Sequence, residues 1–350
     1  MQGIIKHRES NMELLRIISM FLVLVVHADF LSLGIPTSKE LAADSVQTFG
    51  RFFFEALAIG CVNVFVLISG WFGLHTSLKG LCKLLFQCLF FTIGIYIFFL
   101  VLGKAKFDSN TLIEWFFLNK SYWFIKTYLC LYLISPILNA FIEKASPKVF
   151  RTVLIALFLY ICLYGWLFDA TKDIAKGYSI ISFISLYLLA RYAKLYPCKL
   201  SQLNKYADLS IFIGSALVIT ALAMLGVYVQ NKILTNMMFW YSNPLVVLGS
   251  MALLLYFSKL KIDSKVINLI AKSSFAVYLL HCNSNILIGH YAPFVKNLYK
   301  TYSGIEFLGY TFGFMVAVFV VAVVIDQFRI FNWDKGLSPL FENKKDPFKE

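Results

Sequence analysis

The stretch LLRIISMFLVLVVHADF, residues 14–30, has the length and apolar composition of a helix that crosses a bilayer. Two ionisable side chains interrupt it, Arg16 near its start and His27 well inside it. At about 100° per residue, the eleven positions between them place both side chains on one face, about 16 Å apart along the axis. Glu13 falls on the same face within about 40°. The predicted helix therefore carries a polar stripe that leads from a charged pair to an imidazole at mid-bilayer depth.

The composition of the whole chain indicates a membrane protein. Of its 350 residues, 59% are hydrophobic and only 15% are charged, whereas soluble domains carry about 25% charged residues. A water-soluble core of this length cannot bury such an apolar surplus. The formal net charge of +13 is expected to set orientation and meet anionic lipid rather than to bind nucleic acid.

Ten apolar runs are long enough to span a bilayer, which takes about 20 mostly apolar residues. A β-barrel would show alternating hydrophobicity over about ten residues, and these runs do not alternate. We therefore expect an all-α, polytopic membrane bundle that fills residues 1–350 as a single domain, with 329–350 as a cytoplasmic tail. The ten expected spans are residues 14–33, 52–73, 82–102, 122–142, 149–168, 178–196, 209–229, 239–258, 270–290 and 306–328.

The distribution of basic residues predicts the orientation of this bundle. An even number of spans places both termini on one side of the membrane. Of the 32 Lys and Arg residues, 21 fall on that side and 11 on the other. Cytoplasmic loops carry the excess of basic residues, so both termini are expected in the cytoplasm. The first apolar run follows a basic stretch but has no small-residue cleavage site after it, which favours an uncleaved first span.

The stripe on the first span suits acyl transfer chemistry. Ionisable groups inside spans usually face a bundle interior or a wet cavity. A neutral imidazole at His27 could accept the proton of an attacking hydroxyl near neutral pH, and Arg16 could bind the phosphates of a cytoplasmic acyl donor. Lys79 and Lys83 could add to this donor site, or could be ordinary positive-inside lysines. The alternative for the stripe is that Arg16 and Glu13 anchor the interface while His27 hydrogen-bonds a neighbouring helix.

Further polar residues lie in later apolar runs. Tyr278 and His281 are three positions apart and share a helix face, where they would orient an acceptor or simply pack. Asn63 and Ser69 lie in the second span and are interpreted as interhelical hydrogen-bonding residues, with donors to a reaction oxyanion as the alternative. Asp29 is expected to be solvated near the external edge.

Other sites are disfavoured by what the sequence lacks. The seven cysteines are scattered and form no CxxC pair, which argues against a disulfide framework or a zinc site. No metal is therefore expected. The phosphate-binding GxxxxGK[ST], dinucleotide-binding GxGxxG, metalloprotease HExxH and hydrolase GxSxG motifs do not occur either.

Four stretches resemble segments of acyltransferase family 3, integral-membrane enzymes that acylate carbohydrates. The opening RESNMELLRIISMFLVLVVH contains the family's Arg, ten residues and a His, reproduced by Arg16 and His27. CVNVFVLISGWF is similar to the family's AVNxFxLISGYF, SYWFIKTYLCLYLISPIL to its WFxxxYxxLYLLxPxL, and SSFAVYLLH to its late YLxH segment. The resemblance touches spans one, two, four and nine, in the family's order.

The resemblance implies a membrane O-acetyltransferase of the bacterial cytoplasmic membrane. The acetyl group would come from cytoplasmic acetyl-CoA, and the acceptor would be a hydroxyl of a surface polysaccharide or its lipid-linked precursor. In the family the first-span His is held to be catalytic and the Arg to serve the donor, roles that fall on His27 and Arg16, with Glu13 holding Arg16. Many members have an Arg-rich segment entering the third span, where this sequence offers only Lys79 and Lys83.

Two other classes of protein compete with this interpretation. A secondary transporter or flippase of a glycan intermediate would also use about ten helices and intramembrane histidines. Transporter folds often show two related halves with broken helices at matching positions, and no such echo is visible in this sequence. A sensory or scaffold protein would leave the polar stripe of the first span without a purpose.

Overall fold

A computed structural model describes residues 8–118, 122–168, 175–341 and 346–348, and no strand occurs among them. The helices of the first half are α1 (Ser10–Val26), η1 (His27–Leu31), α2 (Ser38–Ala43), α3 (Ser45–Ala58), α4 (Cys61–Phe72), α5 (Leu78–Val101), α6 (Ser109–Phe116), α7 (Trp123–Lys144) and α8 (Pro147–Cys162). Those of the second half are η3 (Leu163–Leu167), η4 (Ala175–Gly177), α9 (Ile180–Leu195), α10 (Lys205–Tyr228), α11 (Lys232–Met237), α12 (Pro244–Ser258), α13 (Lys265–His281), α14 (Ser284–Ile286), η5 (Leu287–Tyr291), α15 (Ala292–Thr301), α16 (Gly304–Asn332), η6 (Trp333–Leu337) and η7 (Ser338–Phe341). The expected all-helical architecture is confirmed for this part of the chain.

Each of the ten expected spans falls on one to three of these helices. Among the described residues, seven helical segments are long and apolar enough to cross a membrane. They are Ser10–Leu31, Ser45–Phe72, Leu78–Val101, Trp123–Lys144, Pro147–Leu167, Lys205–Tyr228 and Gly304–Phe341. The remaining three, α9, α12 and α13, have 16, 15 and 17 residues. At 1.5 Å per residue they reach about 23–26 Å, less than the hydrocarbon thickness of about 30 Å.

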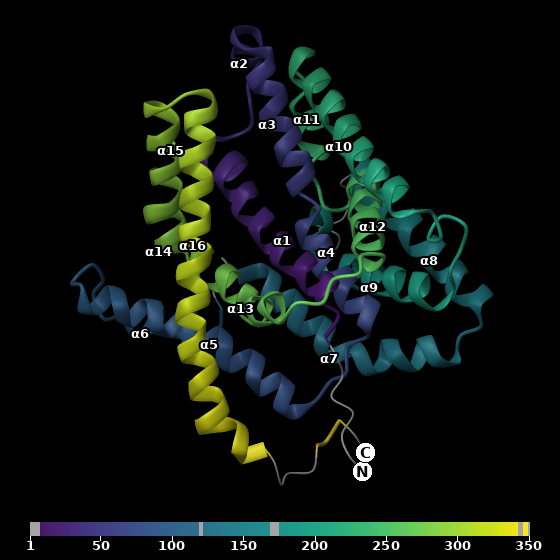
Figure 1. Cartoon of the computed structure of the whole chain (residues 1–350), viewed down its shortest axis with the longest axis vertical. Coiled ribbons are helices and arrows are strands. Elements are labelled where there is room, and N and C mark those ends of the chain that lie inside the picture. Colours follow the sequence, from purple (N-terminus) through teal and green to yellow (C-terminus); the bar gives the residue numbers. More distant parts are fainter. Residues whose placement is uncertain (1–7, 119–121, 169–174, 342–345, 349–350) are drawn as a thin grey trace.

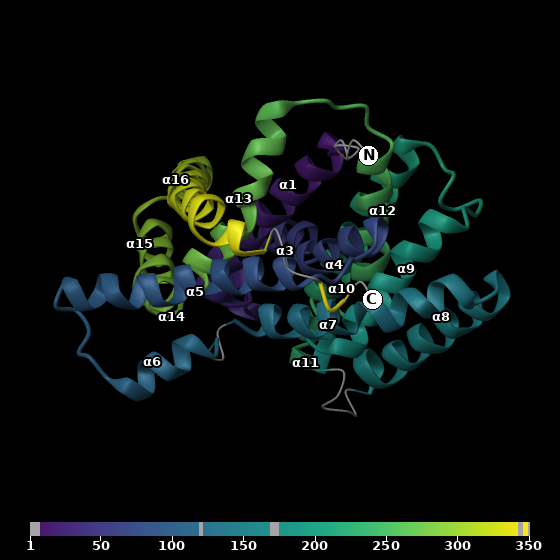
Figure 2. The ribbon, with the colours of Figure 1, turned by 90° about the horizontal axis from the view of Figure 1, so that it is seen from below.

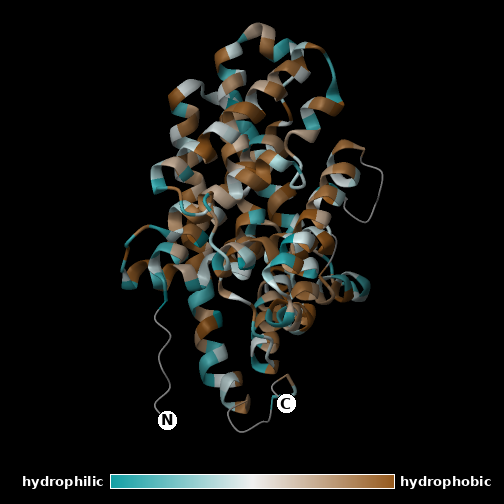
Figure 3. Ribbon diagram, turned by 90° about the vertical axis from the view of Figure 1, so that its right-hand side faces the viewer, coloured by the Kyte–Doolittle hydropathy of each residue, from teal (hydrophilic) through white to brown (hydrophobic). Residues whose placement is uncertain are grey.

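The first helix, α1, lies at the centre of the molecule. It contacts α3, α4, α12, α13 and α16, and Figures 1 and 2 show it between α13 and α16 on one side and α4 and α12 on the other. Leu15 and Leu24 of α1 are fully buried. Hydrophobic residues run along most helices in Figure 3, with hydrophilic residues mainly at helix ends and in connections. The helix with the polar stripe therefore faces protein on several sides.

Local signals in the sequence fix where the surrounding helices begin and how closely they pack. Asn243 caps α12 and Pro244 occupies its first turn, where proline is tolerated. Ser264 caps α13 in the same way. The packing of α4 on α9 needs a glycine at Gly70, because a Cβ there would lie 2.2 Å from the backbone oxygen of Tyr187. These contacts set the positions of the helices that surround α1.

The last long helix extends beyond its expected end at residue 328. α16 continues to Asn332, and Trp333 of the following turn is buried. Arg329 is only 1% exposed, and two hydrogen bonds, of 2.9 and 2.7 Å, to the carboxylate of Asp326 compensate the burial of its charge. Gln87 of α5 donates to the same carboxylate at 3.2 Å. The first residues of the segment expected as a cytoplasmic tail therefore continue α16 and pack against the bundle, and residues 342–345, 349 and 350 lie outside the described part.

Candidate active site

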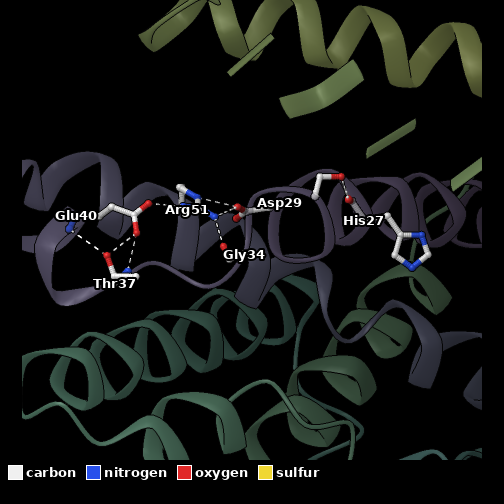
Figure 4. Close-up of polar contacts among 7 residues, drawn as sticks. His27, Asp29, Gly34, Thr37, Glu40 and Arg51 are labelled. Carbon is white, nitrogen blue, oxygen red and sulfur yellow. Dashed lines mark hydrogen bonds and ion pairs between the residues drawn. The ribbon is translucent and has the colours of Figure 1, made fainter. Parts of the chain in front are cut away.

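The candidate site begins where α1 changes its helical geometry. His27 is the first residue of the π-helical turn η1, and Ser32 Oγ donates to its carbonyl oxygen at 2.6 Å. π-helical turns are rare in proteins overall, and those that occur are often found at functional sites. Figure 4 shows the imidazole of His27 and the carboxylate of Asp29 leaving η1 in different directions.

The expected solvation of Asp29 is wrong, because a cation from α3 reaches it. Arg51 binds Asp29 at 2.7 Å and Glu40 at 3.2 Å, and it also donates to the carbonyl of Gly34 (Figure 4). Thr37 and Glu40 form a capping box at the start of α2. These bonds tie the segment after η1 to α3 and so fix the end of α1 from which His27 projects.

The imidazole of His27 lies against a second imidazole from the end of α13. His27 Nδ1 is 2.9 Å from His281 Nε2, and the ring centroids are 5.0 Å apart. The other nitrogen of His281, Nδ1, is 2.5 Å from the carbonyl oxygen of Val277. His281 is fully buried. Two histidines that are 254 positions apart in sequence therefore form a continuous hydrogen-bonded chain that ends on a backbone carbonyl.

If both rings are neutral, the hydrogen-bond partners determine which nitrogen of each imidazole carries the proton. A carbonyl oxygen only accepts, so Nδ1 of His281 carries its proton and Nε2 presents a lone pair. His27 must then donate from Nδ1, which leaves its own lone pair on Nε2. No residue that the structure describes forms a hydrogen bond to this Nε2. The arrangement therefore holds His27 in the tautomer that a general base requires.

His27 forms part of the wall of a cavity of about 270 Å³. The cavity has an aromatic side that includes Trp123 and Tyr241, whose rings stack at 6.0 Å. The residues that surround it are Met20, Val23, Val26, His27, Leu31, Cys61, Val62, Phe65, Trp123, Phe124, Tyr241, Phe275, Tyr278, Cys282, Ser284, Leu287 and Ile288. This is a mostly apolar pocket with a few polar groups, the usual form of a small-molecule site.

The stripe expected on α1 reaches this cavity only in part. Met20, Val23 and His27 line it, at the helical spacing that continues from Arg16. Arg16 itself does not line the cavity. Its guanidinium lies 2.6 Å from Glu13, which is buried. The structure thus brings Glu13 and Arg16 together and leaves Met20 between them and the imidazole.

A polar pair lies one helical turn beyond two aromatic residues of the cavity wall. Phe65 of α4 and Phe124 of α7 line the cavity, with ring centroids 6.2 Å apart. Four positions further along the same helices, Ser69 and Tyr128 share a hydrogen bond of 3.1 Å, and the charge of Arg16 acts on Tyr128. Arg16 therefore lies close enough to Tyr128 to influence it electrostatically, and neither residue lines the cavity.

The other predicted residues occupy different places. Tyr278 lines the cavity beside His27. Asn63 is buried and donates to the carbonyl of Tyr241 at 3.0 Å, outside the cavity wall. Lys79 and Lys83 lie on exposed positions in the first turns of α5 and do not line the cavity.

Three residues of the site were not predicted as site residues from the sequence. Trp123 and Tyr241 form the aromatic side of the cavity. Cys282 lies with its Sγ 3.4 Å from His281 Nε2 and 3.8 Å from His27 Nδ1. Only its position next to His281 offered a signal, because no spacing rule connects it with a residue on the first span.

Comparison with known proteins agrees with this geometry. Residues 9–326 match the acyltransferase domain that defines acyltransferase family 3. No curated protein and no solved structure gives a significant match. The matched region covers most of the chain, from the start of α1 to Asp326, and so includes both histidines and the whole cavity wall. The chain is therefore a member of acyltransferase family 3, a membrane acyltransferase with His27 at the wall of its cavity and His281 hydrogen-bonded behind it.

Proposed function

We propose that this acyltransferase moves an acetyl group from cytoplasmic acetyl-CoA to a hydroxyl of a surface polysaccharide or its lipid-linked precursor. The observation that carries the proposal is the free Nε2 of His27 at the cavity wall, with its Nδ1 held by His281. A lone pair at the cavity wall can accept a proton from a hydroxyl of a substrate bound in the cavity. The stacked rings of Trp123 and Tyr241 offer an aromatic face of the kind that packs against the apolar face of a sugar.

The reaction balances without any other group. The acceptor hydroxyl gives its proton to Nε2 of His27 while its oxygen attacks the thioester carbon. The carbon–sulfur bond then breaks, the acetyl group stays on the acceptor oxygen, and the same proton returns to the leaving thiolate. His281 stabilises the protonated ring by accepting its Nδ1–H, as the orienting residue does in nucleophile–base triads.

The two substrates would approach the cavity from opposite ends. Arg16 lies outside the cavity wall, one turn before Met20 on α1, and its cationic side chain suits the phosphates of CoA. Leu31, at the other end of the same helical segment, and Ile288 line the cavity and are 42% and 61% exposed, which suits entry of the acceptor on that side. Met20, Phe65 and Phe124 would have to move aside for the acetyl thioester to reach His27.

A direct test compares the surface glycans of cells with and without this chain by mass. A difference of one acetyl group per modified sugar supports the proposal. Purified protein in liposomes should also release CoA from acetyl-CoA only when the glycan acceptor is present. Movement of a glycan intermediate across these liposomes without acetyl-CoA would instead support a transporter and contradict the proposal.

Replacement of His281 tests the hydrogen-bonded pair. We expect His281→Phe to lower kcat by about 100-fold or more, because Nδ1 of His27 loses the acceptor that fixes its tautomer. The KM for acetyl-CoA should stay nearly unchanged, since His281 does not line the cavity. Steady-state kinetics on the purified variant measures both constants.

Two further variants separate this role from simple packing. His281→Gln places a carbonyl oxygen near the same position and should restore part of the lost kcat. The double variant with His27→Gln should be no slower than His27→Gln alone, because residues that act as a unit are not additive. Equal losses in the Phe and Gln variants, or additive losses in the double variant, would contradict a positioning role.

Replacement of Arg16 tests the donor side of the site. We expect Arg16→Gln to raise the KM for acetyl-CoA about tenfold, the effect of losing one charge-assisted hydrogen bond to a phosphate. The kcat at saturating donor should change little, because Arg16 lies outside the cavity. Arg151→Gln, an exposed position on α8, is the matched control. An unchanged KM in Arg16→Gln would refute the donor role.

A further inference from the structure

Three potential metal ligands converge at the end of α13. They are His27 Nδ1, His281 Nε2 and Cys282 Sγ, and all three atoms lie within 4.8 Å of one another. The separations are 2.9 Å between the two nitrogens, and 3.4 and 3.8 Å from the sulfur to His281 and His27. His281 and Cys282 are buried. The acyl transfer chemistry proposed above gives Cys282 no task.

The separations are close to those of a tetrahedral zinc site. Zn–N bonds of about 2.0–2.1 Å and Zn–S bonds of about 2.3 Å place neighbouring ligand atoms about 3.3–3.6 Å apart. The sulfur distances match this range within about 0.2 Å, and the two imidazoles would have to part by about 0.4 Å. A set of two imidazoles and one thiolate also has the ligand types that zinc prefers.

The surroundings of the three ligands fit the same ion. His281 donates its other ring N–H to the carbonyl of Val277, the second contact that a zinc-bound histidine usually makes. His27 and Cys282 both line the cavity, so a fourth ligand could approach from that side. Open sites with three protein ligands have this form.

We propose that His27, His281 and Cys282 form a zinc-binding site that switches the enzyme off. Binding releases one proton, that of the Cys282 thiol, since the sulfur must be deprotonated to bind the metal. The single proton of the neutral His27 ring moves from Nδ1, which binds the metal, to Nε2. His27 can no longer accept the proton of the acceptor hydroxyl. The inhibition rests on the catalytic role proposed above for His27, whereas the binding of zinc does not.

Metal binding is tested first, on full-length protein in detergent without donor or acceptor. Zn²⁺ titrated against a chromophoric chelator should bind in one equivalent per chain, and Co²⁺ as a probe should show a thiolate-to-metal absorption band. Cys282→Ser should weaken zinc binding by at least about 100-fold and remove the band, because a thiolate ligand is lost. Cys61→Ser is the matched control, because Cys61 is buried at the wall of the same cavity. Absence of binding, or equal affinity in Cys282→Ser and wild type, would overturn the site.

Inhibition is tested next, with each variant compared in zinc and in chelator. Acyl transfer by wild type and by Cys61→Ser should fall at zinc concentrations that saturate the site, while Cys282→Ser should keep its own zinc-free rate. Equal inhibition of all three would overturn the switch. A protein that binds zinc but transfers no acetyl group even in chelator would contradict the proposed function and leave the metal site standing, so the two failures are distinguishable.

Discussion

His27→Gln is expected to abolish acetyl transfer while leaving the protein folded. A glutamine amide can still donate to His281 Nε2 in place of His27 Nδ1, so the contact between η1 and α13 survives. It has no group that accepts a proton near neutral pH, and loss of a general base typically costs about 100-fold to 10,000-fold in rate. The measurement is the acceptor-dependent release of CoA by purified wild type and variant at saturating substrates.

The matched control for this substitution is His290→Gln. His290 lies on η5, is exposed, and stacks on Phe99 at 5.8 Å without lining the cavity. It should retain wild-type turnover. Both variants should elute as monodisperse protein from a sizing column, which separates loss of chemistry from loss of fold. If His27→Gln retained more than about a tenth of the wild-type kcat, His27 could not be the general base.

Much of the fold follows from the hydrophobic pattern, because a segment inside lipid has no water to hydrogen-bond its backbone. A span must satisfy its backbone hydrogen bonds internally, so each long apolar run has only one stable conformation, the helix. The details that the pattern missed depend on contacts between helices. The second expected span divides at Gly60 into α3 and α4, and α16 continues to Asn332. Neither boundary could be predicted from hydropathy.

The two histidines of the candidate site could be predicted from the sequence, because polar groups are costly inside apolar runs. An imidazole inside an apolar run is costly unless it faces a cavity or a partner, so His27 and His281 stood out individually. Their contact did not, because they are 254 positions apart. The argument against a zinc site at any of the seven cysteines also followed from their spacing alone. A local pattern cannot show which chain segments the tertiary fold brings together.

The second large effect is expected in stability, from Arg329→Met. Arg329 and Asp326 are 1% and 0% exposed and form a bidentate ion pair inside the bundle. Removal of the cation leaves the carboxylate of Asp326 buried with Gln87 as its remaining hydrogen-bond partner among the described residues. Breaking a buried pair in this way typically costs about 3–5 kcal/mol. We expect a clear drop in the midpoint of thermal unfolding in detergent.

A second substitution at Asp326 should restore the stability that Arg329→Met loses. Asp326→Leu combined with Arg329→Met removes both charges, and replacement of a buried pair by apolar residues is often neutral or stabilising. The double variant should therefore recover most of the lost midpoint. Arg151→Met on the exposed face of α8 should stay within about 0.5 kcal/mol of wild type. If the double variant were as unstable as Arg329→Met alone, the loss would come from packing of the long side chain and not from an uncompensated charge. The extension of α16 past residue 328 would then depend on the stem of Arg329 rather than on its bond to Asp326.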